Sequence, residues 1–271
     1  MLTFPNCKIN IGLFVTNRRA DGYHDLETIF YPIHSLHDAL EIMPSSEKTS
    51  LHIDGKPIAG NTEDNLIWKA YNLLKGQYAG VPELDIYLLK AIPMGAGLGG
   101  GSADGAFMLK LLNDYCKLGL DDQTLAGYAL ELGSDCPFFI YNTPQFAKGR
   151  GEQLSAVSLD LSNFSLQLVC PQVHVSTGKA FGMITPKAAP FDLQTINDIS
   201  VVDWKHHISN DFEAPVFAMH PELEDIKKQL YNQGALYAAM SGSGSTIYGL
   251  FPKGQKASVL TDIPHDSYFM E

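Results

Sequence analysis

The chain has 271 residues, of which 45% are hydrophobic, and this length suits one large domain or two modest ones with a sizeable core. The formal net charge of −11 argues against nucleic acid and anionic membranes as general partners, so a polyanionic ligand would need locally focused lysines and arginines. No apolar run reaches the about 18 residues of a transmembrane helix, and the sequence therefore predicts no membrane span.

The cysteines are scattered along the chain without a C-x-x-C pair, at Cys7, Cys116, Cys136 and Cys170. This spacing favours reduced thiols over disulfides or a zinc site. The N-terminal residues lack the pattern of a signal peptide, so the sequence predicts a cytoplasmic protein.

The first predicted element is a strand over residues 6–15, where apolar and polar side chains alternate. Ile9 and Ile11 fall on one side, and Lys8 and Asn10 fall on the other. Side chains two residues apart on a strand point the same way, about 7 Å apart. The polar face therefore either presents an ammonium and an amide to a ligand or is the solvated face of an edge strand.

A polar turn follows over residues 18–24, and its Asp21-Gly22 pair is a hairpin signal. Tyr23 and His24 then stand at the start of the next strand. They are either ordinary residues of a surface turn or an aromatic platform beside a hydrogen-bonding imidazole, which suits a flat heterocycle.

Strands with polar turns are predicted over residues 36–57, and a helix over residues 61–75, with Asn65 near its start. An apolar, β-rich run within residues 83–92 predicts another strand. Residues 103–115 carry apolar side chains at helical spacing and predict a second helix.

The segment Pro93–Ala103 is rich in glycine and lies between that strand and that helix. Glycine has no Cβ, so the backbone can turn sharply and lay its N–H groups against a ligand. The start of the following helix adds unpaired N–H donors and a positive dipole end, with Ser102 as the expected cap. Together these features predict a site for an anion, most often a phosphate.

Other interpretations fit this segment less well. It lacks the Lys-Ser/Thr ending of a Walker loop. Its Gly97-Leu98-Gly99 core would be a dinucleotide fingerprint only in a βαβ unit at the start of a domain, with an acidic residue about 20 positions later. A flexible glycine linker would be polar and would not lie between two apolar segments.

A further helix is predicted over residues 121–132, with an aspartate cap at its start and Gly133 at its end. Asp135 then sits where this helix gives way to a predicted strand in the phenylalanine-rich segment 136–141. A carboxylate between two apolar segments is either partly buried, in which case it needs a partner, or an ordinary turn residue.

Residues 171–200 are predicted to be rich in loops, with Thr177 and Phe181 among them. The glycine loop over residues 241–245 is either a plain hairpin turn or a contact to a phosphate or to backbone. The regular elements predicted in this half of the chain are a strand over 165–170, helices over 203–219 and 221–233, and strands over 236–240 and 246–251.

Three segments, in this order and spacing, resemble the GHMP kinase superfamily, which includes galactokinase, homoserine kinase and mevalonate kinase. They are Pro5–Asn10 with the Arg19–His24 turn, the glycine segment Pro93–Ala103, and the loop Ala239–Ser245. The resemblance covers nearly the whole chain and implies an α+β, two-domain GHMP kinase fold. It implies an ATP-binding domain like domain 2 of ribosomal protein S5 over residues 1–154, and a ferredoxin-like domain over residues 155–271.

The first segment is similar to one branch of the superfamily. The residues Lys8-Ile9-Asn10 and Arg18–His24, with the Gly-Leu-Gly-Gly-Gly-Ser form of the glycine segment, match that branch. Its members phosphorylate the 2-hydroxyl of 4-diphosphocytidyl-2-C-methyl-D-erythritol in the non-mevalonate route to isoprenoid precursors. The resemblance therefore implies two small-molecule substrates, ATP and this cytidine diphosphate sugar alcohol, with Mg²⁺ arriving on the nucleotide.

Site residues follow from the resemblance position by position. Asp135 would be the catalytic base, and Lys8 the cation beside it that favours the carboxylate and stabilises transferred charge. The residues that would contact ATP are Pro93, Met94, Gly95, Ala96, Gly97, Leu98, Gly99, Gly100, Gly101, Ser102 and Ala103, with Asn65 and Lys90 near the adenosine. The residues that would contact the acceptor are Asn10 at its hydroxyls, Tyr23 and Phe181 on either side of the cytosine, His24 at its edge and Thr177 nearby.

The chain departs from the superfamily at two positions. Cys7 stands where alanine is common, and Ala103 stands where a second serine is common, which leaves Ser102 as the nearest candidate for a magnesium ligand. Cys7 and Cys136 also each neighbour a proposed catalytic residue. Either thiol could face the site and be activated by the Lys8 ammonium, or both could be buried away from it, as strand alternation favours for Cys7.

Two other functions are compatible with parts of this pattern. A homoserine or mevalonate kinase would share the glycine segment but would not need Tyr23, His24 and Phe181 as an aromatic clamp. A nucleotide-binding protein without activity would keep the glycine loops, and the loss of Lys8 or Asp135 would favour it. Both residues are present.

Overall fold

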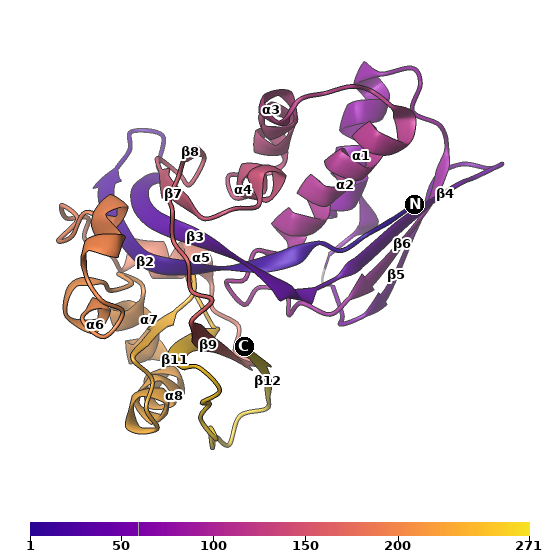
Figure 1. Ribbon diagram of the computed structural model, residues 1–271. Coiled ribbons are helices and arrows are strands. Elements are labelled where there is room, and N and C mark those ends of the chain that lie inside the picture. The colour runs from indigo at the N-terminus through magenta and orange to yellow at the C-terminus, as the bar shows by residue number, and fades with distance from the viewer. Residues whose placement is uncertain (59) are drawn as a thin grey trace. The chain divides into compact units, whose positions relative to one another are not determined.

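The structure, a computed structural model, describes residues 1–58 and 60–271, which divide into two units (Figure 1). Unit 1 consists of Met1–Lys8, Pro32–Met94 and Gly99–Thr143, and unit 2 consists of Ile9–Tyr31, Gly95–Leu98 and Pro144–Glu271. The chain therefore passes between the units within its N-terminal strands and within the glycine segment. The division into family domains at residue 155 stays a prediction, because these units are defined by packing alone.

Unit 1 contains a sheet with the strand order β1-β4-β6-β5. Its strands are β1 (Leu2–Thr3), β4 (Ala39–Pro44), β5 (Ser50–Gly55) and β6 (Leu84–Lys90), and all neighbours are antiparallel except β5 and β6. Side chains of β6 alternate between buried and exposed, so one face of the sheet is core and the other faces solvent. The strands predicted over residues 36–57 and 83–92 are confirmed.

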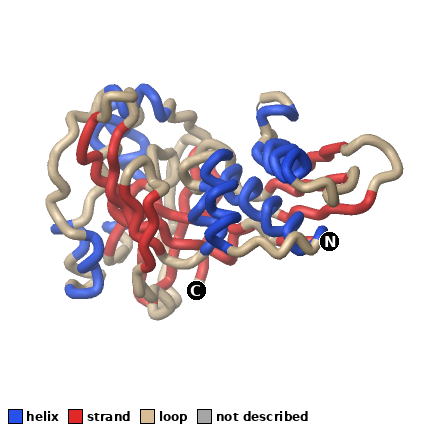
Figure 2. The backbone as a smooth tube through the Cα atoms, turned by 90° about the horizontal axis from the view of Figure 1, so that it is seen from above, coloured by secondary structure: helices blue, strands red, loops and turns tan. Residues whose placement is uncertain are grey.

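The helices of unit 1 pack on one another beside this sheet (Figures 1 and 2). They are η1 (Thr62–Asp64), α1 (Leu66–Gln77), α2 (Gly100–Cys116), α3 (Asp122–Leu132) and α4 (Cys136–Tyr141). The helix predicted from residue 61 is interrupted at Asn65, whose side chain accepts a hydrogen bond from the Ile67 amide and so caps α1. The aspartate cap of α3 and its end at Gly133 are confirmed.

The strand predicted over residues 136–141 is wrong, because this segment forms α4. Pro137 fits the first turn of a helix, where its missing N–H costs no hydrogen bond. The two phenylalanines and Ile140 that follow are fully buried, so the segment is apolar on all sides. A short run of this kind carries no periodicity that separates a buried strand from a buried helix.

The expected serine cap of α2 is also wrong. Gly99 occupies the cap position with a φ of 71°, a left-handed conformation that favours glycine, and the helix begins at Gly100. Ser102 therefore lies inside the first turn of α2, where its backbone is already helical.

An N-terminal hairpin joins β2 (Asn6–Arg18) to β3 (His24–His37), which confirms the hairpin predicted from Asp21-Gly22. The sheet has the order β2-β3-β7-β8, and β7 (Gln145–Lys148) and β8 (Gln153–Ala156) extend it by antiparallel pairing. β2 is an edge strand, and of the two interpretations of its polar face the solvated one is wrong. Lys8 and Asn10 are each only 3% exposed.

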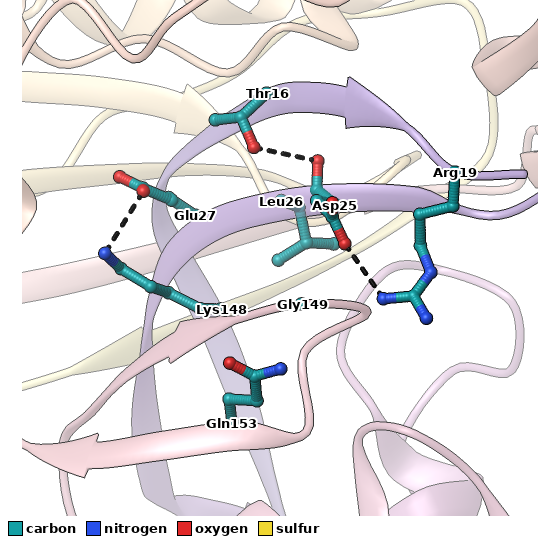
Figure 3. Close-up of a pocket in the computed structure, with 8 residues that line it drawn as sticks. All are labelled: Thr16, Arg19, Asp25, Leu26, Glu27, Lys148, Gly149 and Gln153. Atoms are coloured by element: carbon teal, nitrogen blue, oxygen red, sulfur yellow. Dashed lines mark hydrogen bonds and ion pairs between the residues drawn. The ribbon is translucent and has the colours of Figure 1, made fainter.

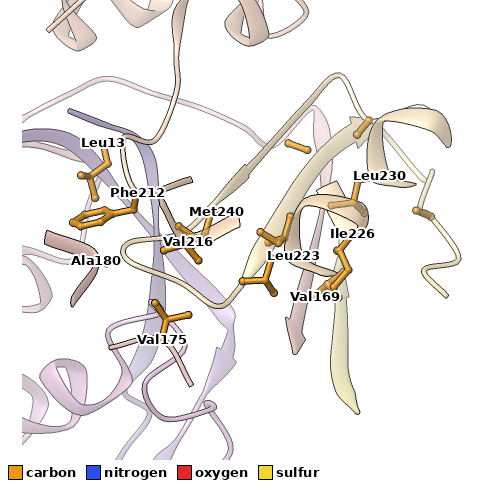
Figure 4. Packing of buried hydrophobic residues seen from close by; sticks show 14 of the residues in the cluster. Leu13, Val169, Val175, Ala180, Phe212, Val216, Leu223, Ile226, Leu230 and Met240 are labelled. Atoms are coloured by element: carbon orange, nitrogen blue, oxygen red, sulfur yellow. The ribbon is translucent and has the colours of Figure 1, made fainter. Parts of the chain in front are cut away.

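The C-terminal part of unit 2 contains an antiparallel sheet with the order β10-β11-β9-β12. Its strands are β9 (Phe164–Pro171), β10 (Tyr237–Met240), β11 (Ile247–Pro252) and β12 (His265–Met270), and the helices are α5 (Thr177–Gly182), η2 (Leu193–Asp198), α6 (Trp204–His207), α7 (Glu213–Met219) and α8 (Pro221–Asn232). Leu223, Ile226 and Leu230 on one side of α8 join a buried hydrophobic cluster with residues of this sheet (Figure 4). The strands predicted on both sides of the 241–245 loop are confirmed.

One prediction in this part of the chain is confirmed and one needs correction. Residues 171–200 are rich in loops, as expected, and contain the short helices α5 and η2. The helix predicted over 203–219 is broken into α6 and α7, because the residues between them bond to β2: the Leu13 amide donates to Ser209 O, and the Asp211 amide donates to Leu13 O.

Antiparallel pairing predominates in the sheets, and the chain combines these sheets with helices, so the α+β fold class is confirmed. None of the helices within residues 1–58 and 60–271 is long and apolar enough to cross a membrane.

Candidate active site

Lys8 and Asp135 meet in unit 1, although 127 positions separate them in the sequence (135 − 8). The Lys8 ammonium lies 3.5 Å from Asp135 Oδ2; the lysine side chain is only 4% exposed, and the aspartate side chain is 36% exposed. Burial lowers the pKa of Lys8, while the charge of Asp135 and a hydrogen bond to it act in the opposite direction. The structure thus brings the two predicted catalytic residues together, with the carboxylate on the accessible side.

The fold between α3 and α4 explains why Asp135 is accessible. α3 ends at Gly133, the Cys136 amide donates to Gly133 O, and α4 begins at Cys136. The apolar residues of α4 are drawn into the core, which leaves Asp135 at the polar end of the helix. The interpretation of Asp135 as a partly buried carboxylate with a partner is therefore confirmed.

Gly99 lets the N-terminus of α2 approach this ion pair. A Cβ on Gly99 would lie 3.1 Å from the Lys8 side chain and 3.0 Å from the ring of Phe139, closer than ordinary contacts. The first amides of α2 have no partner within the helix and carry its positive dipole end. An ammonium, helix amides and a half-exposed carboxylate can together hold a phosphate and accept a proton.

The tip of the glycine segment, Gly95–Leu98, belongs to unit 2 and is held there by the 241–245 loop. Ser241 Oγ donates a 2.8 Å hydrogen bond to Gly97 O, and the Thr246 amide donates to Ala96 O at 3.1 Å. Gly97 has a φ of 79°, and a Cβ there would overlap the Ser241 carbonyl oxygen. The 241–245 loop is therefore more than a plain hairpin turn, because it contacts the backbone of the glycine segment.

Asn10 is tied into the same part of unit 2. Its side-chain amide donates to Thr28 Oγ1 at 3.0 Å, and its backbone amide donates to Ser241 Oγ at 3.2 Å. Its carbonyl accepts a hydrogen bond from the Tyr248 hydroxyl at 2.9 Å. Ser241 therefore links β2 directly to the glycine segment, while the expected role of Asn10 at the acceptor hydroxyls stays a prediction.

The predicted nucleobase residues also lie in unit 2, with ring partners that the sequence did not indicate. His24 stacks on Phe181 with ring centroids 4.9 Å apart and planes inclined by 16°, and Phe181 meets Phe212 edge to face. Tyr23 is 56% exposed, and the Arg150 guanidinium lies over its ring at 5.0 Å from the centroid. The sandwich of a cytosine between Tyr23 and Phe181 stays a prediction.

Arg150 was not among the residues predicted for the site. The signal available for it is its position between two glycines in the polar turn that follows β7. Thr177, in contrast, was predicted near the acceptor, and its hydroxyl lies 2.9 Å from the hydroxyl of Ser243 in the 241–245 loop.

An open pocket of about 330 Å³ lies along the same hairpin (Figure 3). Its charged groups face one another: Arg19 pairs with Asp25 at 3.1 Å, and Lys148 pairs with Glu27 at 3.4 Å. Surface pairs of this kind compensate each other and leave little net field for an ionic ligand. The residues that line the pocket are Thr16, Arg19, Asp25, Leu26, Glu27, Lys148, Gly149 and Gln153.

The two residues expected near the adenosine have internal partners. The side-chain oxygen of Asn65 accepts the hydrogen bond that caps α1. The Lys90 side chain is fully buried, and its ammonium bonds to Asp38 and to Asp104, 2.7 Å away. Burial raises the pKa of Asp104, and the charge of Lys90 opposes this shift. Asp38 and Asp104 are not among the predicted site residues, and the expected places of Asn65 and Lys90 near the adenosine stay predictions.

The thiols beside the Lys8–Asp135 pair are buried. Cys7 and Cys136 are both 0% exposed, which favours the interpretation that they face away from the site. Burial raises the pKa of the Cys136 thiol to about 12, while a hydrogen bond with Ser102 opposes the shift.

Comparisons with known proteins bear on the whole chain. The family model for the GHMP kinases N terminal domain matches residues 65–143, and that for the GHMP kinases C terminal domain matches residues 196–266. The chain is 54% identical over 253 residues to the 4-diphosphocytidyl-2-C-methyl-D-erythritol kinase of Parabacteroides distasonis, which covers 93% of this chain and 92% of that protein.

Solved structures agree with this similarity. A crystal structure of 4-(cytidine 5'-diphospho)-2C-methyl-D-erythritol kinase aligns with a TM-score of 0.77 and 31% identity, over 92% of this chain and 90% of that one. A homoserine kinase from Cytophaga hutchinsonii aligns with a TM-score of 0.71 over 98% and 95% of the two chains, but at 16% identity it supports the fold alone.

Proposed function

The chain belongs to the 4-diphosphocytidyl-2-C-methyl-D-erythritol kinase family of the GHMP kinases, and from this membership we propose its reaction and the residues that perform it. It is an ATP-dependent kinase with a small-molecule acceptor. It transfers the γ-phosphoryl group of ATP to the 2-hydroxyl of 4-diphosphocytidyl-2-C-methyl-D-erythritol, a step of the non-mevalonate route to isoprenoid precursors. The two-domain GHMP kinase fold expected from the sequence is confirmed.

The observation that carries the mechanism is the Lys8–Asp135 pair at the N-terminus of α2. The acceptor is a tertiary alcohol, which is a poor acid, so its oxygen needs a base as it attacks phosphorus. Asp135 accepts the hydroxyl proton while the new P–O bond forms. The bond between the γ-phosphorus and the oxygen that bridges it to the β-phosphate breaks, and ADP leaves with that electron pair.

Lys8 contributes charge and does not transfer a proton in this proposal. Its ammonium is held against Asp135 in a largely buried position, where an electrostatic interaction is stronger than in water. The ammonium therefore stabilises the negative charge that spreads over the phosphoryl oxygens during the reaction. The amides at the start of α2 add a fixed dipole of the same sign.

In this proposal Mg²⁺ binds together with ATP. Groups of three or more His, Cys, Asp or Glu side chains suited to a metal ion are absent from the part of the chain that the structure describes. Mg²⁺ commonly binds through substrate phosphates with few protein ligands, and it neutralises phosphate charge there. Ser102, partly exposed in the first turn of α2, would supply the protein hydroxyl.

For the acceptor, we propose that Tyr23, His24 and Phe181 form the cytosine site. The His24–Phe181 stack offers a flat apolar platform, and Tyr23 presents an exposed ring on the same hairpin. Thr177 and Asn10 supply hydroxyl and amide groups for the rest of the acceptor. Homoserine and mevalonate contain no nucleobase that could stack on these rings.

A coupled ADP-release assay with a panel of alcohols tests this proposal. Turnover is expected with 4-diphosphocytidyl-2-C-methyl-D-erythritol and not with homoserine or mevalonate. The variants Phe181→Ala and Phe181→Leu should both raise the acceptor KM about 5- to 150-fold, equivalent to about 1–3 kcal/mol of lost base stacking, and leave the KM for ATP nearly unchanged.

Phe181→Leu is the matched control, because Phe181 also packs on the core cluster of unit 2 and leucine preserves that apolar contact. Equal increases in both KM values would remove the cytosine assignment. Preferred turnover of homoserine or mevalonate would replace the acceptor altogether.

A further inference from the structure

A buried ionic cluster lies at the base of the glycine segment in unit 1. It consists of Lys90, Asp38 and Asp104, whose side chains are 0%, 0% and 4% exposed. The Lys90 ammonium bonds to one carboxylate oxygen of each aspartate. Such a cluster is costly to bury unless its geometry is well satisfied, so its position in the fold calls for an explanation.

Asp38 holds the incoming side of the glycine segment. Its Oδ1 accepts hydrogen bonds from the Ala91 amide at 2.6 Å and from the Ile92 amide at 2.8 Å. These two residues connect the end of β6 to Pro93, so the carboxylate fixes the backbone immediately before the segment begins. Asp38 is itself fixed, since its amide donates to Pro5 O at 2.8 Å.

Asp104 holds the outgoing side. It belongs to α2, one helical turn beyond Gly100, and its Oδ2 accepts from Lys90 at 2.7 Å. Gly100 makes this contact possible, because a Cβ there would lie 3.0 Å from the Lys90 ammonium and 2.9 Å from the Ile92 side chain. One ammonium thus joins the two stems of the segment, the Ala91–Ile92 stem through Asp38 and the α2 stem through Asp104.

We propose that Lys90, Asp38 and Asp104 are positioning residues for ATP, which set the spacing of the two stems of the glycine segment and so the direction of the first amides of α2. The inference rests on the proposed use of this segment for ATP phosphates. Lys90 acts through the backbone that it holds and does not touch the adenosine. Ionic hydrogen bonds suit this task because they fix direction as well as distance, which apolar packing does not.

The single variant Lys90→Met would leave two buried carboxylates uncompensated and could unfold the protein. The test therefore uses the triple variant Lys90→Met/Asp38→Asn/Asp104→Asn, which removes all three charged groups of the cluster. The carboxamide introduced at position 38 keeps an oxygen for the Ala91 and Ile92 amides. Lys75→Met is the matched control. It removes another lysine–carboxylate pair of unit 1, the pair with Glu83, and neither residue belongs to the glycine segment or to its two stems.

The measurements are the affinities for ATP and for inorganic tripolyphosphate by calorimetry, together with KM for each substrate and kcat. The folded triple variant should lose affinity for ATP and for tripolyphosphate by the same factor. Its kcat/KM for ATP should fall on the order of 10²-fold, as expected for small misplacement of binding groups, with little change in the acceptor KM. Lys75→Met should change none of these values.

Three results would overturn the proposal. Normal ATP affinity in the folded triple variant would reduce the cluster to a structural role. A loss of ATP affinity without a loss of tripolyphosphate affinity would return Lys90 to the adenosine. Equal increases in both KM values would indicate a general disturbance of the fold. Because binding is measured without an acceptor, these outcomes are separate from a failure of the acceptor assignment.

Discussion

Two buried lysines of unit 1 serve the start of α2 in different ways. Lys8 lies against Gly99, and Lys90 lies against Gly100; a Cβ on either glycine would crowd the lysine that faces it. Both lysine side chains are almost fully buried, at 4% and 0% exposed. Consecutive glycines at one helix terminus therefore admit two lysine side chains.

The carboxylate partners separate the two sites. Asp135 is 36% exposed and lies 3.5 Å from Lys8, whereas Asp38 and Asp104 are 0% and 4% exposed and bond directly to Lys90. A reacting hydroxyl can reach the first carboxylate but not the other two. Burial of a lysine alone thus does not distinguish the two sites, whereas the accessibility of its carboxylate partner does.

The largest expected effect concerns the accessible pair. Asp135→Asn keeps the shape of the side chain and removes the base, so kcat should fall by roughly 10²–10⁴ while both substrates bind with near-normal affinity. Lys8→Met should also lower kcat, and the double variant should be little worse than the more damaged single one, because the two residues act as a unit. The measurement is steady-state turnover with binding checked by calorimetry.

Asp122→Asn, at the exposed start of α3, is the control for the loss of a carboxylate in the same unit. If Asp135→Asn retains most of its turnover at saturating substrate, the proposed base is wrong. Asp135 would then be only the polar residue at the start of α4.

The second-largest effect is on stability. Here substitution of Lys90 should cost more than substitution of Lys8. Lys90→Met strands two buried carboxylates and should lower the free energy of unfolding by about 3–5 kcal/mol. Lys8→Met leaves Asp135 partly in contact with water, so its cost should be clearly smaller. Urea unfolding of the two variants under one set of conditions measures the difference. Equal losses would remove the distinction between an accessible pair and an enclosed cluster.

The sequence predicted features whose signal is local. The glycine segment between a strand and a helix, the Asp21-Gly22 hairpin and the two strands around residues 241–245 are each marked by neighbouring residues. The pairing of Lys8 with Asp135 has no local signal and came from the resemblance. The expected cytoplasmic location and the individual site roles stay predictions.

Other features could not be predicted, for physical reasons. Asp38 and Asp104 reach Lys90 from 52 and 14 positions away, and nothing beside either of them in the sequence marks a buried charge. The segment 136–141 is apolar throughout, so its period is undefined and its helix follows from tertiary packing. Ser102 is a good cap by residue type, but α2 begins before it, at Gly100, with Gly99 in the cap position.

The smallest expected effect concerns Cys7 and Cys136, the cysteines next to Lys8 and Asp135 in the sequence. It tests whether a reagent that can reach Asp135 can also reach these thiols. Cys7 and Cys136 are fully buried, and burial raises the pKa of the Cys136 thiol to about 12, so little of that thiol is ionised at pH 8. Iodoacetamide should therefore modify both residues far more slowly in the folded protein than in urea, with little loss of activity. Cys116, which is partly exposed, serves as the internal control and should react first. Peptide mapping by mass spectrometry gives the rate at each site. Rapid alkylation of Cys7 or Cys136 with loss of activity, and protection by ATP, would place a thiol on the reacting side of the pair and extend the accessible region beyond the carboxylate.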